Sequence, residues 1–151
     1  MITFRGQVWR IVFADQVDAP TAPARAPEGR FHHDNQWAVY TSLSLEGAGV
    51  AIAAYVSRDD RERVAVSLDI DAQVVDLRTL PDPSEASIVW QTHRTRGLPA
   101  PTWDLSDAAR QHGASGVLYP SRSRPELTHL ALFHPSAIRT THQAIPWRPA
   151  D

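Results

Sequence analysis

Arg30 lies a short distance before the start of a predicted helix. Residues Val39–Thr41 have the pattern of a short buried strand, and apolar and small side chains then recur at helical spacing over Leu45–Val56. Ser44 is placed to cap that helix. A helix N-terminus offers unpaired backbone N–H groups and a partial positive charge, to which Arg30 adds a full charge. These features together predict a binding site for an anion.

Arg10 and Ser121 are two further residues whose side chains can bind or position a ligand. Residues 7–13 alternate as a strand, and Arg10 emerges from one face of it. Taken alone, Arg10 is an ordinary strand arginine that reaches solvent. Ser121 follows a predicted strand at residues 116–119, in a turn of the kind where serine is common. Neither residue specifies a function by itself.

Several histidines raise the alternatives of a metal site and a hydrolase. His32, His33 and Asp34 are adjacent, but neighbouring side chains on a loop rarely converge on one ion and no thiol is present. We therefore expect no metal and interpret one of these histidines as a hydrogen-bond donor in a pocket. Ser121 and His134 do not define a hydrolase, because the chain lacks a Gly-x-Ser-x-Gly elbow.

The composition narrows the class of protein. A chain of 151 residues with 42% hydrophobic content fits one domain, which we assign to residues 1–151. The net charge of −2 lacks the footprint of a nucleic-acid binder, and all 15 basic residues are arginines. The absence of cysteine excludes a thiol nucleophile and disulfides. No segment reaches the roughly 18 apolar residues of a membrane span, so we expect a cytoplasmic protein.

The order of the predicted elements indicates an α+β domain. A proline-containing loop separates the first predicted strand from Arg30 and the strand and helix that follow it. Polar connectors and prolines separate the later elements. Strands and helices do not alternate strictly, which favours a mixed, mostly antiparallel central sheet. Strands are predicted at residues 7–13, 39–41, 63–70, 73–77, 116–119 and 128–134, and helices at residues 45–56, 84–90 and from 102 or 104 to 112, ended by Gly113.

Short motifs in a particular order make the chain resemble the RES domain family. They are VWRIV near the start, GRF followed ten residues after its arginine by Tyr40 in AVYTS, DLR, and GVLYPSRSRP followed by LALF. The resemblance extends from about residue 8 to about residue 138. It implies a fold similar to that of ADP-ribosyltransferases, and a toxin that degrades NAD+ by splitting the nicotinamide–ribose bond with phosphate as acceptor.

The resemblance also implies a role for individual residues. Arg10 and Arg30 match the two arginines of the family, Tyr40 its strand-end tyrosine, and Ser121 the serine of the YPS turn. Two guanidinium groups can bind a pyrophosphate in bidentate fashion. Tyr40 offers a flat face to nicotinamide and a hydroxyl to a ribose or phosphate oxygen. Ser121 can position the ribose or the attacking phosphate.

One position departs from the pattern of the family. A glutamate is expected eleven residues beyond Tyr40, and Ala51 stands there instead. A carboxylate would stabilise the oxocarbenium-like ribose as the base leaves. Glu46 is the nearest replacement, but five residues correspond to roughly 140° of helix rotation, so it cannot occupy the same place. The alternative is that the Glu46 carboxylate only complements the dipole of its helix.

Three functions therefore follow as expectations. The first is an NAD+ phosphorylase or glycohydrolase toxin, neutralised by an Xre-type helix-turn-helix antitoxin and forming a homo-oligomer within that complex, as the resemblance implies. The second is a protein ADP-ribosyltransferase, since residues 40–42 at a strand end fit a ribose-binding strand. The third is a catalytically inactive NAD-binding module that acts through a partner, which Ala51 favours.

Overall fold

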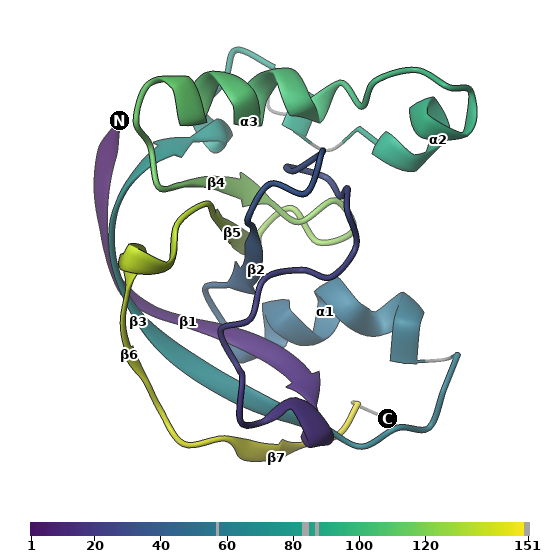
Figure 1. The fold of residues 1–151 in the computed structure, drawn as a ribbon, viewed down its shortest axis with the longest axis vertical. Coiled ribbons are helices and arrows are strands. Elements are labelled where there is room, and N and C mark those ends of the chain that lie inside the picture. The colour runs from purple at the N-terminus through teal and green to yellow at the C-terminus, as the bar shows by residue number, and fades with distance from the viewer. Residues whose placement is uncertain (57, 83–84, 87, 150–151) are drawn as a thin grey trace.

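The computed structural model describes residues 1–56, 58–82, 85–86 and 88–149. Within them helices cover a curved sheet, and long connecting segments run across it (Figure 1). No helix of these residues is long and apolar enough to cross a membrane. The strands are β1 (Ile2–Phe13), β2 (Val39–Ser42), β3 (Arg63–Asp76), β4 (Gly116–Pro120), β5 (Thr128–Leu132), β6 (Ile138–Thr141) and β7 (Ile145–Trp147), and the helices are α1 (Leu45–Val56), α2 (Trp90–Thr95) and α3 (Thr102–Gln111).

The sheet closes on itself through its two longest strands. Its order is β1-β2-β5-β4-β3-β6, and β1 also pairs with β3 along its full length, from Ile2 opposite Val74 to Phe13 opposite Arg63. β7 extends the same edge of β3 as β6. Among the described pairings only β3 with β4 is parallel. The fold is therefore α+β with a mixed, mostly antiparallel sheet, as predicted.

Alternation along the strands divides the core into two clusters. On β5, Leu130 and Leu132 face a cluster with Val8, Val39 and Leu68, inside the closed circuit of strands. Ala131 faces the other way, into a second cluster beneath α3. Each fully buried aliphatic side chain contributes about 1.5–3 kcal/mol to folding. Both faces of β2, β4 and β5 are therefore held in place, which makes these strands a rigid base for a site.

Local signals at helix ends are confirmed in α1 and α3. The Ser44 hydroxyl accepts the backbone N–H of Gly47 at 3.0 Å, so Ser44 caps α1 as expected. Gly113 follows α3 with φ of 81°, a left-handed conformation that favours glycine. The expectation that Thr102 or Asp104 caps α3 is wrong, because α3 follows Pro101 without a side-chain cap. The Thr102 hydroxyl donates instead to the carbonyl of Arg30.

The strands after α1 differ from the prediction in length. The two strands expected at residues 63–70 and 73–77 form the single strand β3, since β1 pairs with it without interruption. β1 likewise begins at Ile2 rather than at residue 7. The sequence suggested a break near Ile70–Gln73 because the alternation there is weak. Pairing with a long partner strand supplies the hydrogen bonds that keep this stretch extended.

The helix expected at residues 84–90 is misplaced. Ser84 and Ser87 lie outside the described residues, and α2 begins at Trp90, where the predicted helix should have ended. Strands β6 and β7, which cover the edge of β3, were not predicted. These segments are only four and three residues long, and the second contains Pro146, so pairing with β3 makes them strands.

Candidate functional site

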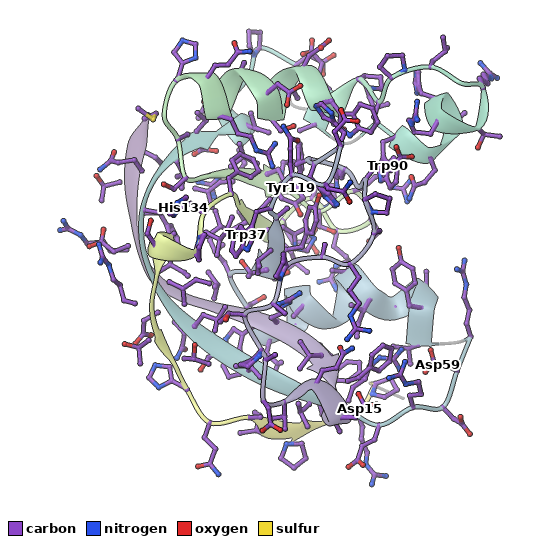
Figure 2. The ribbon with its side chains drawn as sticks, viewed as in Figure 1. Asp15, Trp37, Asp59, Trp90, Tyr119 and His134 are labelled. Carbon is purple, nitrogen blue, oxygen red and sulfur yellow. The ribbon has the colours of Figure 1, made fainter. Side chains whose placement is uncertain are left out.

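A row of polar and aromatic side chains crosses three neighbouring strands at the centre of the molecule. Ser42 on β2 pairs with His129 on β5, which pairs with Tyr119 on β4. One row further along, Tyr40 pairs with Ala131. Residues opposite one another in antiparallel strands point to the same face. These four polar side chains therefore share the face that carries the second core cluster, and Tyr119 lies near the middle of the molecule in Figure 2.

Arg30 lies over this row and is only partly satisfied by the protein. Its guanidinium carbon is 4.8 Å from the ring centroid of Tyr119 and 5.4 Å from that of Phe31. Nη2 donates to the carbonyl of Ala86, whereas Nε is buried and has no hydrogen-bond partner among the described residues. Among the described residues no carboxylate pairs with Arg30. Burial lowers the pKa of Arg30. A half-buried cation without an ionic partner among the described residues is suited to an anionic ligand.

Tyr40 is fixed beside Arg30 by two hydrogen bonds. Its oxygen accepts the backbone N–H of Phe31 at 2.9 Å and lies 2.7 Å from Nδ1 of His32. Burial lowers the pKa of His32, so its ring is neutral, and Nε2 donates to the carbonyl of Ala26. Nδ1 must then accept the Tyr40 proton. Burial raises the pKa of Tyr40, so the phenol stays protonated.

The segment that carries Arg30 is held against α3 through its backbone carbonyls. Trp103 donates its indole N–H to Gly29 at 2.8 Å, Thr102 donates to Arg30, and Arg110 donates to Phe31 at 2.9 Å. Gly29 is required where it stands, because a Cβ there would lie 2.5 Å from the His32 ring. Helix α3 thus positions the backbone around Arg30.

Ser121 and Glu46 are connected through one arginine. Ser121 is buried at the end of β4, and its hydroxyl accepts the backbone N–H of Arg124 at 3.2 Å. The Arg124 side chain reaches Glu46 in the first turn of α1, with 3.1 Å between Nη1 and Oε1. The structure therefore joins these two predicted residues, although they are 75 positions apart in sequence. Ala51, further along α1, is exposed.

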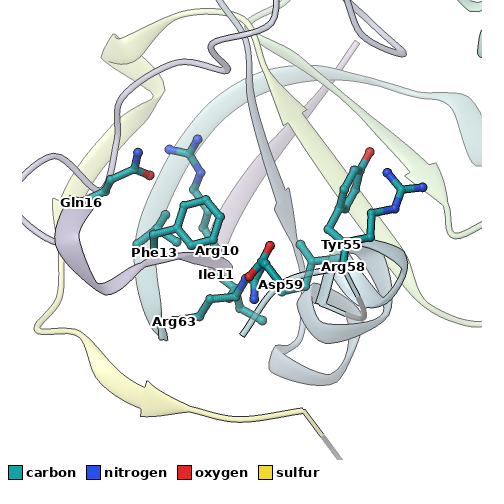
Figure 3. Close-up of a pocket in the computed structure, with 10 residues that line it drawn as sticks. Arg10, Ile11, Phe13, Gln16, Tyr55, Arg58, Asp59 and Arg63 are labelled. Atoms are coloured by element: carbon teal, nitrogen blue, oxygen red, sulfur yellow. The ribbon is translucent and has the colours of Figure 1, made fainter. Parts of the chain in front are cut away.

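Arg10 has surroundings different from those of Arg30. Its Nη1 donates to the carbonyls of Pro20 and Ala22 at 2.8 and 2.7 Å, and burial lowers its pKa to about 10. It lines a cavity of about 380 Å³ together with Tyr55 and Arg58 (Figure 3). No contact among the described residues joins Arg10 to Arg30. Joint binding of one pyrophosphate by both arginines stays a prediction.

The sequence did not single out His129 or Tyr119, and it named Ser42 only as part of the strand end at residues 40–42 that fits a ribose-binding strand. The available signal was strand alternation, since His129 shares the face of Ala131 rather than that of Leu130. His33, considered above as a ligand, lies 2.6 Å from Asp34 and 2.7 Å from Asp107. No group of three such side chains in the described part of the chain is arranged to hold a metal ion.

The fold and the site define an α+β domain with a half-buried arginine facing an aromatic and hydroxyl-rich sheet surface. The sequence model of the RES domain matches residues 7–150, so the chain belongs to the RES domain family. No curated protein sequence matches the chain. Among solved structures it is similar to a chain of the MbcT–MbcA toxin–antitoxin complex of M. tuberculosis, with a TM-score of 0.62 and 17% identity over 98% of this chain and 87% of that one.

Proposed function

We propose that this protein is the toxin of a toxin–antitoxin pair and degrades NAD+ by cleaving the bond between nicotinamide and ribose. Membership of the RES domain family supports the proposal, as does the similar fold in a toxin–antitoxin complex. The observation that carries it is the environment of Arg30, whose buried Nε has no hydrogen-bond partner in the described part of the chain and whose guanidinium group lies beside the rings of Tyr119 and Phe31. A dinucleotide offers phosphate oxygens to the guanidinium group and a flat base to an aromatic ring.

In the proposed complex Arg30 binds the pyrophosphate. Its remaining N–H groups form charge-assisted hydrogen bonds, which are strong where water is excluded. Tyr40 stacks on the nicotinamide, and its two hydrogen bonds hold the ring in place before the substrate arrives. Arg10, on a strand adjacent to β2, is proposed to bind the same pyrophosphate as Arg30. Ser121 positions the ribose or the acceptor.

The proposed reaction is phosphorolysis. An oxygen of inorganic phosphate attacks C1′ of the nicotinamide ribose while the bond from C1′ to the pyridinium nitrogen breaks. The electron pair of that bond goes to the ring nitrogen, so nicotinamide leaves as a neutral molecule and ADP-ribose 1-phosphate is formed. Positive charge develops on the ribose in the transition state. Glu46 supplies negative charge near this region, although its carboxylate is paired with Arg124.

The proposed partner is an Xre-type helix-turn-helix antitoxin that blocks the site, within a complex in which the toxin forms a homo-oligomer. The cytoplasm is the proposed place of action, because NAD+ is available there. Phosphate is the proposed co-substrate, and water is the alternative acceptor.

Nicotinamide release from NAD+ tests the proposal. The purified chain is incubated with NAD+ with and without inorganic phosphate, and the sugar product is identified by mass spectrometry. We expect nicotinamide and ADP-ribose 1-phosphate from the wild type, and a loss of at least about a hundredfold in kcat/KM for Arg30→Ala, as is typical when an electrostatic contact to the transition state is removed. Arg5→Ala is the matched control, because Arg5 is exposed and pairs with Asp71 away from the site.

Three results would contradict the proposal in different ways. Equal turnover in Arg30→Ala and Arg5→Ala would show that Arg30 does not bind the substrate. Transfer of ADP-ribose to a protein, with little nicotinamide released in its absence, would establish a protein ADP-ribosyltransferase. Tight binding of NAD+ that stays intact would establish an inactive binding module, the function that Ala51 favours.

A further inference from the structure

Ser42 and His129 form a hydrogen-bonded pair on the sheet surface beneath Arg30. Ser42 Oγ lies 2.5 Å from Nδ1 of His129, and the two residues are 1% and 5% exposed. A buried polar pair between two strands costs folding free energy in desolvation, which its single hydrogen bond only partly offsets. Two apolar side chains would fill the same positions without that cost. The pair therefore calls for an explanation beyond packing.

The imidazole of His129 is held firmly and oriented by its neighbours. Its ring lies 5.4 Å from that of Tyr119, centroid to centroid, on the strand next to it. On the other side, Gly47 of α1 packs so closely on Ser42 that a Cβ there would lie 3.2 Å from the Ser42 Cβ. Helix α1 therefore packs against Ser42, and Tyr119 packs against His129. These contacts restrict the positions of both side chains of the pair.

The second ring nitrogen of His129 is available to a ligand. Nδ1 is occupied by Ser42, and Nε2 has no hydrogen-bond partner among the described residues. Burial, reinforced by the positive charge of Arg30, lowers the pKa of His129 to about 4, so the ring is neutral at physiological pH. When the Ser42 hydroxyl donates to Nδ1, the single proton of a neutral imidazole resides on Nε2. A neutral imidazole of this kind donates a hydrogen bond to an oxygen that carries negative charge.

We propose that His129 is a substrate-binding residue of this site, donating Nε2–H to an oxygen of the anionic ligand held by Arg30, and that Ser42 is the positioning residue that fixes the imidazole. This inference rests on the proposed function for the identity of the ligand, NAD+ or its phosphate co-substrate. Arg30 supplies the charge and His129 a directed donor on the sheet below it. His129 thereby gives the site a fixed hydrogen-bond donor beside Arg30, and no carboxylate of the described residues pairs with Arg30 to compete with the anionic ligand.

Two replacements of His129 separate this role from a purely structural one. The amide nitrogen of glutamine falls near the position of Nε2, whereas that of asparagine falls near Nδ1. If His129 acts on the ligand, His129→Gln keeps kcat/KM for NAD+ within about threefold, and His129→Asn lowers it at least about tenfold, the range expected for a lost hydrogen bond to a charged group. If His129 only satisfies Ser42, the order of the two variants is reversed. His112→Gln, at the exposed end of α3, is the control.

A spectroscopic measurement reports on His129 without relying on turnover. In ¹⁵N-labelled protein we expect Nε2 of His129 to carry the proton and its resonance to move on titration with NAD+ or inorganic phosphate. Ser42→Ala should populate the other tautomer and weaken NAD+ binding about threefold or more, with the thermal transition measured alongside to show that the variant is folded.

The outcomes distinguish this inference from the proposed function. Cleavage of NAD+ by the wild type, together with full activity in His129→Asn or an Nε2 resonance unmoved by both ligands, overturns the role of His129 and leaves the function intact. A wild type that neither binds nor cleaves NAD+ overturns the function. In that case a response of Nε2 to phosphate alone still supports His129 as an anion-binding residue, and its absence overturns both.

Discussion

The guanidinium carbon of Arg30 lies 4.8 Å from the ring centroid of Tyr119, which places a cation from a loop over an aromatic residue from the central strand β4. This contact joins the two parts of the site, since the loop is fastened to α3 and the strand belongs to the rigid sheet. The ring holds the guanidinium group without neutralising its charge. Arg30 is thereby oriented while its capacity to bind an anion is preserved.

Tyr119→Leu should weaken NAD+ binding by about two- to thirtyfold, because the cation–π contact that orients Arg30 contributes about 0.5–2 kcal/mol. Tyr119→Phe keeps the ring and should bind NAD+ like the wild type, since the Tyr119 hydroxyl has no hydrogen-bond partner among the described residues. Burial raises the pKa of Tyr119 to about 12, so no charge is lost with the hydroxyl. Isothermal titration of both variants with NAD+ measures this. Equal weakening in both would show that the hydroxyl, and not the ring, supports Arg30.

Tyr40→Phe should lower the free energy of unfolding by about 1–3 kcal/mol, because it leaves the backbone N–H of Phe31 without its acceptor in a buried position. It also removes the donor to Nδ1 of His32. Urea denaturation measures the loss. Tyr55→Phe is the control, since Tyr55 is 54% exposed on α1. A similar change in both variants would contradict the role assigned to the Tyr40 hydroxyl.

His33 should make the stability of the segment around Arg30 depend on pH. Burial lowers the pKa of His33, but hydrogen bonds to Asp34 and Asp107 outweigh it and raise the pKa above its ordinary value. A raised pKa in the folded state means that His33 contributes its full stabilisation below about pH 6.5, the pKa of an unfolded histidine. The contribution is lost as pH rises through the folded-state pKa.

The stability difference between wild type and His33→Gln should therefore be larger at pH 6 than at pH 9. His32 and His129, whose pKa values are lowered, act in the opposite direction, but they are present in both proteins and cancel in the difference. Chemical denaturation at the two pH values provides the measurement. An unchanged difference would mean that His33 does not titrate against Asp34 and Asp107.

Glu46→Gln and Arg124→Gln should leave the folding free energy nearly unchanged, because the ion pair between them is exposed and screened by solvent. Glu46→Gln should lower kcat more than Arg124→Gln, because the Glu46 carboxylate supplies negative charge near the ribose whereas Arg124 only holds the loop that carries Ser121. A double-mutant cycle on nicotinamide release tests this. Equal and non-additive losses in the two variants would instead show that Glu46 acts only by holding that loop.

Gly116→Ala should destabilise the fold by about 1–3 kcal/mol, as overpacking does. A Cβ at residue 116 would lie 2.5 Å from the carbonyl oxygen of Ala131 on β5, and a backbone atom paired in a sheet cannot yield. Gly6→Ala on β1 is the matched control, because its Cβ would meet only the movable ring of Phe4, at 3.3 Å. Equal thermal transitions for the two variants would contradict the assigned approach of β5 to β4.

Much of the fold follows from local pattern. Neighbouring residues determine the Ser44 cap, helix α1, the end of α3 at Gly113 and the opposite faces of Leu130 and Ala131. Caps, turns and strand alternation depend on contacts within a few positions of the chain. The full length of β3 and the existence of β6 and β7 depend on partner strands far along the chain. Local propensity carries no information about such partners.

The sequence by itself determined the α+β class with its mixed sheet, and it singled out Arg30, Tyr40 and Ser121 as candidate site residues through their motifs. Only the tertiary structure decided that Ser42 and His129 meet beneath Arg30, and that Arg10 donates to the loop carbonyls of Pro20 and Ala22. The reason is physical. Motif and alternation arise from interactions along the chain, whereas the site is formed by strand register and by the docking of a loop on α3, which bring distant side chains together.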